Sequence, residues 1–308
     1  MSARFVPSHR CLIRLAGAML LLLFHGCGHE GAVASPEEQM REGWKRYRLG
    51  EFNAAVRIFK FLEASQPPGS EAHLQGLYGE ASCWNHRRDG RDSAKAISGY
   101  RAIIDQAPAS PLAAWAALDI VRAKHLAPAD QDLDYAQLAR EYGGVYRKYP
   151  DTPAGEEAFL YRIRLSLPTA DADQARKDLE EIEAFLQAHP KTPFLSPLYT
   201  LMAESCHHLN EEDKRLEYLI KALQTREVDP TTPFFELSTA YWNIAYAAEF
   251  EAGNFAIARE YYNRLMTEFP RESRVFLVRK ALARMDAVEA ALREGRALPA
   301  EYVGGSLQ

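Results

Sequence analysis

The pattern of apolar and polar residues is clearest between residues 239 and 270. Trp242, Ala245 and Tyr246 recur at steps of three and four residues, so they lie on one face of a helix. Gly253 interrupts this period, as a glycine at the end of a helix does. A second run of the same period follows, with Phe255, Ala258, Tyr262 and Leu265. The stretch therefore predicts two helices joined by a tight turn.

Prolines divide most of the chain at regular intervals. They stand at Pro67, Pro108, Pro150, Pro190, Pro230 and Pro270, which are 40 to 42 residues apart. Four of them begin similar sequences, PASP, PDTP, PKTP and PTTP. The first proline cannot continue a helix, the Ser or Thr can cap the next helix, and the second proline suits the first helical position. The expected caps are Ser110, Thr152, Thr192 and Thr232, with Ser70 and Ser273 in looser versions.

Each interval between these prolines predicts one pair of helices. The first five pairs are 36–49 with 51–65, 70–87 with 92–106, 111–125 with 132–149, 153–167 with 172–188 and 194–209 with 212–226. Residues 239–270 form the sixth pair, and a last helix at about 273–294 is expected to cap the array. The third to fifth pairs lack a glycine turn, so their register stays open. We expect an all-α fold, an α-solenoid over residues 36–294, with a flexible tail at 295–308.

Two of the pairs carry a recognisable repeat motif. The sixth has an early Trp242, a Gly-x-Phe turn, the small Ala258, the aromatic Tyr262 and the closing proline. The first has the matching residues Gly43, Gly50, Phe52, Ala55, Phe59 and Pro67. These residues resemble the tetratricopeptide (TPR) repeat, which is normally 34 residues long. HEAT-type repeats match the length of about 40 residues better, but they do not have these specific residues.

The first 26 residues have the features of an export signal. Arg4, Arg10 and Arg14 supply positive charge, and residues 15–24 (LAGAMLLLLF) supply an apolar core that is short for a bilayer span. Cleavage before Cys27, in FHGC, resembles processing of a bacterial lipoprotein. Cleavage after Ala34 is the alternative. Residues 27–35 are expected to be a short tether.

The P-x-[ST]-P punctuation and the expected lipid anchor resemble the BamD-like outer-membrane lipoproteins and related periplasmic TPR proteins. That resemblance implies an outer-membrane-anchored lipoprotein facing the periplasm, with a soluble periplasmic protein as the alternative. It implies a scaffold and provides no catalytic motif.

Charge and composition restrict the class of partner. The chain has 37 basic and 42 acidic residues, a net charge of −5 and 47% hydrophobic residues. Loss of residues 1–26 would remove three arginines and no acid. Proteins that bind duplex nucleic acid usually show a basic excess or stripe, and the sequence has neither. We therefore expect no nucleic-acid partner.

The sequence contains none of the common catalytic or phosphate-binding motifs, such as G-x-S-x-G, a phosphate loop, H-E-x-x-H or C-x-x-C. We expect no enzyme activity, cofactor or metal. Cys83 and Cys206 lie on helices three repeats apart, so two buried thiols are expected and not a disulfide. In Cys206-His207-His208, adjacent helical residues point about 100° apart and cannot easily converge on one ion.

First helices line the concave face of a TPR array, so their polar and aromatic residues are the candidates for partner binding. The candidates are Trp44, Tyr47, Arg48, Asn85, Arg88 and Asn243. The alternative interpretation is that the aromatic residues pack inside the repeat and the arginines are solvated.

Two functions follow from these observations. The first is a non-enzymatic scaffold of the cell envelope that binds a protein or peptide. The second is a glycan- or small-molecule-handling protein, for which Glu156-Glu157 and Glu180-Glu181 would supply carboxylates. A closed polar pocket would favour the second function.

Overall fold

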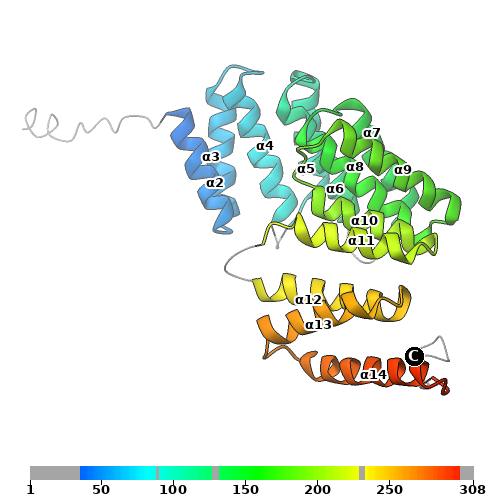
Figure 1. Ribbon diagram of the computed structural model, residues 1–308. Helices are drawn as coiled ribbons and strands as arrows, with labels where there is room; N and C mark the ends of the chain where they lie inside the picture. The colour runs from blue at the N-terminus through cyan, green and yellow to red at the C-terminus, as the bar shows by residue number, and fades with distance from the viewer. Residues whose placement is uncertain (1–34, 88–89, 127–131, 229–232, 299–308) are drawn as a thin grey trace, which may run out of the picture. The chain divides into compact units, whose positions relative to one another are not determined.

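The computed structural model describes residues 35–87, 90–126, 132–228 and 233–298 (Figure 1). In these ranges the chain forms thirteen α-helices, one 3-10 turn and one π-helix, with no strand, which confirms the predicted all-α class. None of the described helices combines the length and the apolar character needed to cross a bilayer. The predicted export signal, Cys27 and the end of the predicted tail lie outside the described residues.

The observed helices follow the predicted pairs closely. They are α2 Pro36–Arg48, α3 Phe52–Ser65, α4 Glu71–His86, α5 Ser93–Gln106, α6 Pro111–His125, α7 Tyr135–Lys148, α8 Pro153–Ser166, α9 Ala172–Ala188, α10 Leu195–His208, α11 Glu212–Gln224, α12 Pro233–Tyr246, α13 Phe255–Glu268 and α14 Val275–Arg293. The 3-10 turn η1 is Leu167–Thr169, and the π-helix η2 is Ala247–Glu251.

The chain divides into two compact units, residues 1–83 and 84–308. In the first unit α2 packs against α3. In the second unit the closest contacts join α5 to α6, α7 to α8, α10 to α11 and α12 to α13. The first two of these join helices of consecutive predicted pairs, and the last two join the helices of the fifth and sixth pairs. First helices of consecutive pairs also touch, α6 with α8 and α8 with α10. This is the TPR-like α-solenoid architecture that the punctuation predicts.

Phe59 is the centre of the first unit and is fully buried. A Cβ atom added to Gly43 would lie 2.7 Å from Cε1 of this ring, and one added to Gly79 would lie closer still. Helices α2 and α4 therefore approach Phe59 through positions that have no side chain. The glycine of the repeat motif has a packing role here.

Three of the predicted caps are confirmed. The side-chain oxygen of Ser110 accepts a hydrogen bond from the backbone N–H of Ala113 at 3.1 Å, and Thr152 accepts from Gly155 at 3.1 Å. Ser70 accepts from the N–H of His73 at 3.3 Å. Each bond satisfies one of the donors that a helix leaves unpaired at its start. Thr232 lies outside the described residues.

The predicted caps Thr192 and Ser273 are wrong. Here the chain makes an additional turn, so that the next helices begin only at Leu195 and Val275. Thr192 accepts from the N–H of Phe194 at 3.3 Å within this turn, and the carboxylate of Glu272 accepts from the N–H of Arg274 at 2.6 Å. The N–H groups of Phe194 and Arg274 thus lie before the helices begin, and these bonds do not cap the first helical turn.

Left-handed residues form the tight turns of three pairs. Gly50 has φ 75° and Gly253 has φ 65°, as the motif predicts. Asn210 takes the same conformation in the fifth pair, with φ 56°. Asparagine tolerates this conformation better than most residues, so it replaces the missing glycine. The register of the fifth pair follows from this turn.

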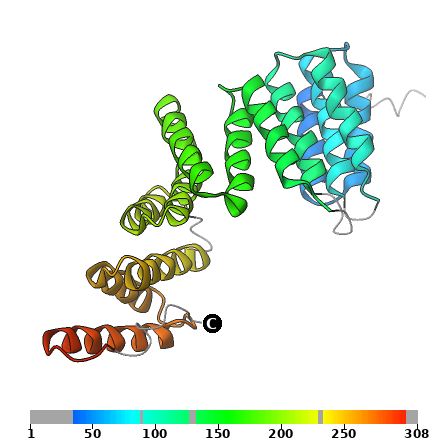
Figure 2. The same cartoon turned by 90° about the vertical axis from the view of Figure 1, so that its right-hand side faces the viewer.

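Helix α14 covers the sixth pair, which confirms the predicted last helix. Figure 2 shows α12, α13 and α14 side by side. Val278, Ala281 and Met285 of α14 are buried against this pair. The π-helix η2 places the buried Glu249 where Tyr262 donates to it at 2.9 Å and Arg284 of α14 lies 2.7 Å away.

Candidate functional site

The aromatic candidates of the first unit are engaged in packing. The Trp44 ring lies 5.3 Å from Tyr47, 5.0 Å from Phe59 and 6.2 Å from Tyr78, measured between ring centroids. These contacts agree with the alternative interpretation, in which Trp44 and Tyr47 pack inside the repeat. Arg48 is exposed at the end of α2.

The candidates of the second unit lie in different environments. Asn85 is 3% exposed, and its side-chain oxygen accepts from Arg91 at 3.3 Å. Arg91 also donates to the carbonyl oxygen of Ala123 at 3.1 Å, near the end of α6 where the helix dipole favours a positive charge. Asn85 is therefore buried and bonded to Arg91, which lies in the turn between α4 and α5. Asn243 of α12, in contrast, is exposed. Arg88 lies outside the described residues.

A cavity of about 330 Å³ lies along the first helices of the fourth and fifth pairs. Its lining consists of Leu160 and Arg164 of α8, Ser196, Pro197, Thr200, Leu201 and Glu204 of α10, and Arg226. We call this cavity the α8–α10 groove. It combines apolar side chains with charged groups of both signs.

The positions that line the α8–α10 groove recur with the motif, although the residues at them differ. Leu160 and Thr200 each stand seven residues after the second proline of their P-x-T-P sequence, and Arg164 and Glu204 stand eleven residues after it. Positions four residues apart on a helix share one face. This register is a signal present in the sequence, whereas the candidates predicted above were aromatic, amide and arginine residues of other pairs.

Next to the groove, an ion-pair network joins α6 to α8. Arg122 of α6 donates to Asp119 at 3.0 Å and also to Glu157 of α8. Burial works against the charge of Arg122, but Asp119 and Glu157 outweigh it and raise the pKa of the guanidinium. The network holds consecutive first helices together and contains no nucleophile.

Two further groups of this region have shifted pKa values. Burial and then the nearby charge of Arg164 lower the pKa of His125, whose Nδ1 lies 3.1 Å from the hydroxyl of Tyr142. Burial raises the pKa of Tyr142. At neutral pH both groups are therefore uncharged and serve as hydrogen-bonding core residues.

Three of the four glutamates considered for a glycan- or small-molecule-handling function, Glu156, Glu157 and Glu181, lie next to basic side chains of the protein itself. Glu157 pairs with Arg122, and Glu181 pairs with Arg162. Glu156 lies 3.7 Å from His189. Glu180, which precedes Glu181 in the sequence, is exposed. These acids lie on helix surfaces and do not line the α8–α10 groove.

In the described part of the chain, Cys83 and Cys206 are buried thiols that form no disulfide with each other, as expected. Burial, followed by the charge of Glu211, raises the pKa of Cys206 to about 11. The thiolate is therefore scarce at neutral pH, and this thiol is unsuited to nucleophilic chemistry.

No protein-family model and no curated protein matches the chain in sequence. Among solved structures it is similar to Acl4, the assembly chaperone of RpL4, with a TM-score of 0.45 and 13% identity over 84% of this chain and 100% of that one. Human IFIT1, as a dimer with PPP-AAAA, gives 0.41 and 15%, over 84% of this chain and 58% of IFIT1. TTC0263, a thermophilic TPR protein of Thermus thermophilus, gives 0.27 and 16%, over 81% and 100%.

This chain spans less than two thirds of the length of IFIT1. Likenesses at these identities carry no information on ligands. The TPR-like fold of this chain follows from its own helix pairs, glycine turns and buried motif residues.

Proposed function

We propose that the chain is a non-enzymatic scaffold that binds an extended segment of another protein along its first helices. The observation that carries this proposal is the α8–α10 groove, which is lined by the first helices of two consecutive repeats. Backbone and side chains of a peptide can follow such a groove from one repeat to the next. The net negative charge of the chain supports a protein partner over a nucleic acid.

The lining of the groove defines the chemistry of the segment. Leu160, Pro197 and Leu201 offer apolar contact, and the exposed Arg164 offers a positive charge. We infer a segment that inserts an apolar side chain and places a carboxylate near Arg164. Glu204 is exposed at the equivalent position of the neighbouring helix α10 and would select a basic residue in the same segment.

We also propose that the scaffold works in the cell envelope, attached to the outer membrane through lipid on Cys27, as in the BamD-like lipoproteins that the sequence resembles. The predicted export signal and the FHGC sequence support this localisation. A single acyl anchor holds a protein weakly, so a diacylated or triacylated cysteine is expected.

Site-specific photo-crosslinking in intact cells tests the peptide-binding face. A photoreactive residue at Thr200, an exposed position in the groove, is expected to capture a discrete protein partner. The same residue at Lys177, an exposed position on the second helix α9, is the matched control and is expected to capture none. Equal capture at both positions would show that the groove is not the binding face.

Charge reversal then tests the role of the arginine. Arg164→Glu is expected to abolish the Thr200 crosslink, because it places a negative charge where the carboxylate of the segment would lie. Arg176→Glu on α9 reverses another exposed charge away from the groove and is expected to leave the crosslink unchanged. Retention of the crosslink in the Arg164 variant would refute the assigned chemistry.

A further inference from the structure

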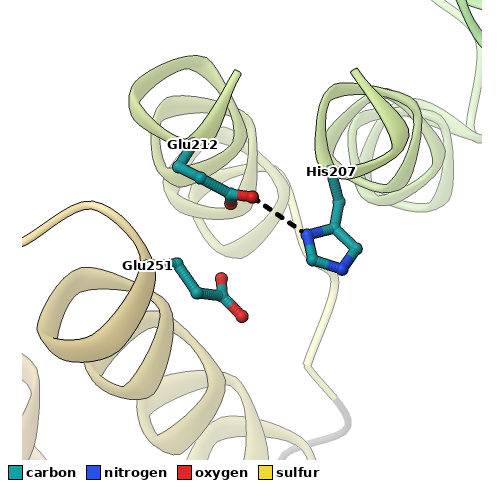
Figure 3. Close-up of side chains that lie close together, drawn as sticks. All are labelled: His207, Glu212 and Glu251. Atoms are coloured by element: carbon teal, nitrogen blue, oxygen red, sulfur yellow. Dashed lines mark hydrogen bonds and ion pairs between the residues drawn. The ribbon is translucent and has the colours of Figure 1, made fainter. Parts of the chain in front are cut away.

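His207, Glu212 and Glu251 converge where the fifth helix pair meets the sixth (Figure 3). His207 lies at the end of α10, Glu212 begins α11, and Glu251 ends the π-helix η2. One ligand atom from each of the three lies within 4.8 Å of the other two. Nδ1 of His207 and Oε1 of Glu212 are 3.1 Å apart.

This cluster shares only His207 with the Cys206-His207-His208 sequence discussed above. Cys206 is buried in the core, while the His207 side chain is exposed on the adjacent helical position. The partners of His207 come from the next helix and the next repeat. The left-handed Asn210 makes this convergence possible, because it turns the chain so that Glu212 faces the end of α10.

We propose that His207, Glu212 and Glu251 bind a divalent transition-metal ion of the Zn²⁺ type. We call this cluster the interpair site. An imidazole nitrogen with two carboxylate oxygens is a donor set that suits Zn²⁺ better than Mg²⁺ or Ca²⁺, which prefer oxygen ligands alone. Three protein ligands leave a fourth position for water, as in open zinc sites.

The spacing of the donors is compatible with such an ion. With metal–ligand distances of roughly 2.0–2.2 Å, neighbouring atoms of a tetrahedron are about 3.3–3.6 Å apart. The His207–Glu212 distance of 3.1 Å is slightly shorter than this range. The Glu251 side chain is 22% exposed, and its ligand atom lies within 4.8 Å of those of His207 and Glu212.

Arg215 is the positive group that faces both carboxylates. Its Nη1 lies 3.4 Å from Oε2 of Glu212 and also pairs with Oε2 of Glu251. Since Glu212 turns its Oε1 to His207, Arg215 and a metal ion would engage different oxygens of that carboxylate. Hydrogen-bonded partners of this kind orient the carboxylates that ligate metals. The two carboxylates and the guanidinium together carry one net negative charge.

Metal at the interpair site would link two consecutive repeats. The ligands come from α10, α11 and the end of the helical run that begins with α12, so the unfolded chain has no preformed site. Binding free energy then adds to the stability of the folded state. The ion would stiffen the junction between the fifth and sixth pairs.

Zn²⁺ binding to the purified full chain, without a histidine tag, is measured by competition with a chromogenic chelator at neutral pH. We expect one ion per chain. His207→Ala and Glu251→Gln are each expected to weaken binding by more than about tenfold, because each removes a ligand. His208→Ala, on the adjacent position of the same helix, is the matched control and should bind as the parent does. Parent-like affinity in the first two variants, or no binding by the parent, would overturn the proposal.

Thermal unfolding gives a second readout. Zn²⁺ is expected to raise the Tm of the parent and of His208→Ala but not that of Glu251→Gln, which preserves the volume of the side chain. Circular dichroism of the metal-free variants establishes that they fold. An equal rise with Mg²⁺ would exclude a site built on the imidazole.

Discussion

Phe59 illustrates how single residues shape the first unit. Its ring is fully buried, and Cβ atoms added to Gly43 or to Gly79 would both lie less than 3 Å from it. Trp44 packs against its edge at 5.0 Å between centroids, which further restricts the ring.

Gly43→Ala is expected to destabilise the protein by about 1–3 kcal/mol, because the new methyl group would lie 2.7 Å from Phe59. Urea unfolding followed by circular dichroism measures the change. The control is Gly144→Ala in α7, where a Cβ meets only the end of Arg147 at 3.9 Å. That change should be neutral or stabilising by about 0.5–1 kcal/mol. Equal effects would contradict the packing role of Gly43.

The buried ion pair of the sixth repeat makes a second prediction. Arg284→Met is expected to cost about 3 kcal/mol or more, because the Glu249 side chain is fully buried and would lose its main positive partner. Adding Glu249→Gln, which keeps an acceptor for Tyr262, should recover a large part of this loss. Urea unfolding of both variants provides the measurement. A double variant as unstable as the single one would show that packing, and not charge, explains the loss.

Turns set the register of the helix pairs at the scale of the element. In the fifth pair Asn210 adopts the left-handed turn conformation that Gly50 and Gly253 adopt in the first and sixth pairs. Arg215 follows five residues after Asn210, at the position where the buried Ala55 and Ala258 follow their glycines. A charged side chain thus occupies the close-packed position of the motif, and it is this arginine that faces Glu212 and Glu251.

Asn210→Ala is expected to destabilise the protein by about 1 kcal/mol, because alanine is strained at φ 56°. Asn210→Gly should cause no loss, since glycine adopts this conformation freely. Both are measured by urea unfolding. If Asn210→Gly proved as unstable as Asn210→Ala, the side chain and not the backbone conformation would be the important feature.

At the scale of the whole molecule, the proposed attachment to a membrane through lipid on Cys27 is testable. Cys27→Ala is expected to shift the protein from the membrane to the soluble fraction, because the acyl anchor would be lost. The mass of the mature N-terminus separates lipidation at Cys27 from cleavage after Ala34. Cys11→Ala lies within the export signal and should leave fractionation unchanged. Equal solubility of parent and Cys27 variant would refute the anchor.

Most helix boundaries were predictable because their signals are local. Pro111 with Ser110, Pro153 with Thr152 and the Gly50 and Gly253 turns act within one or two turns of backbone. The prediction failed at Thr192 and Ser273, where an additional turn delays the helix. That turn is held by the buried Thr192 and by Glu272, and local sequence does not reveal burial.

The all-α class, the number and length of the helix pairs and the capping helix could be predicted from the sequence, because periodicity and capping depend on neighbours along the chain. The side-chain contacts across helices became visible only in the folded structure: Arg122 with Glu157, Phe59 with two glycines, and His207 with Glu212 and Glu251. They could not be predicted because of the rotation of side chains around the helix axis. Each residue turns a helix by about 100°, so the face that meets a partner depends on packing and not on local propensity.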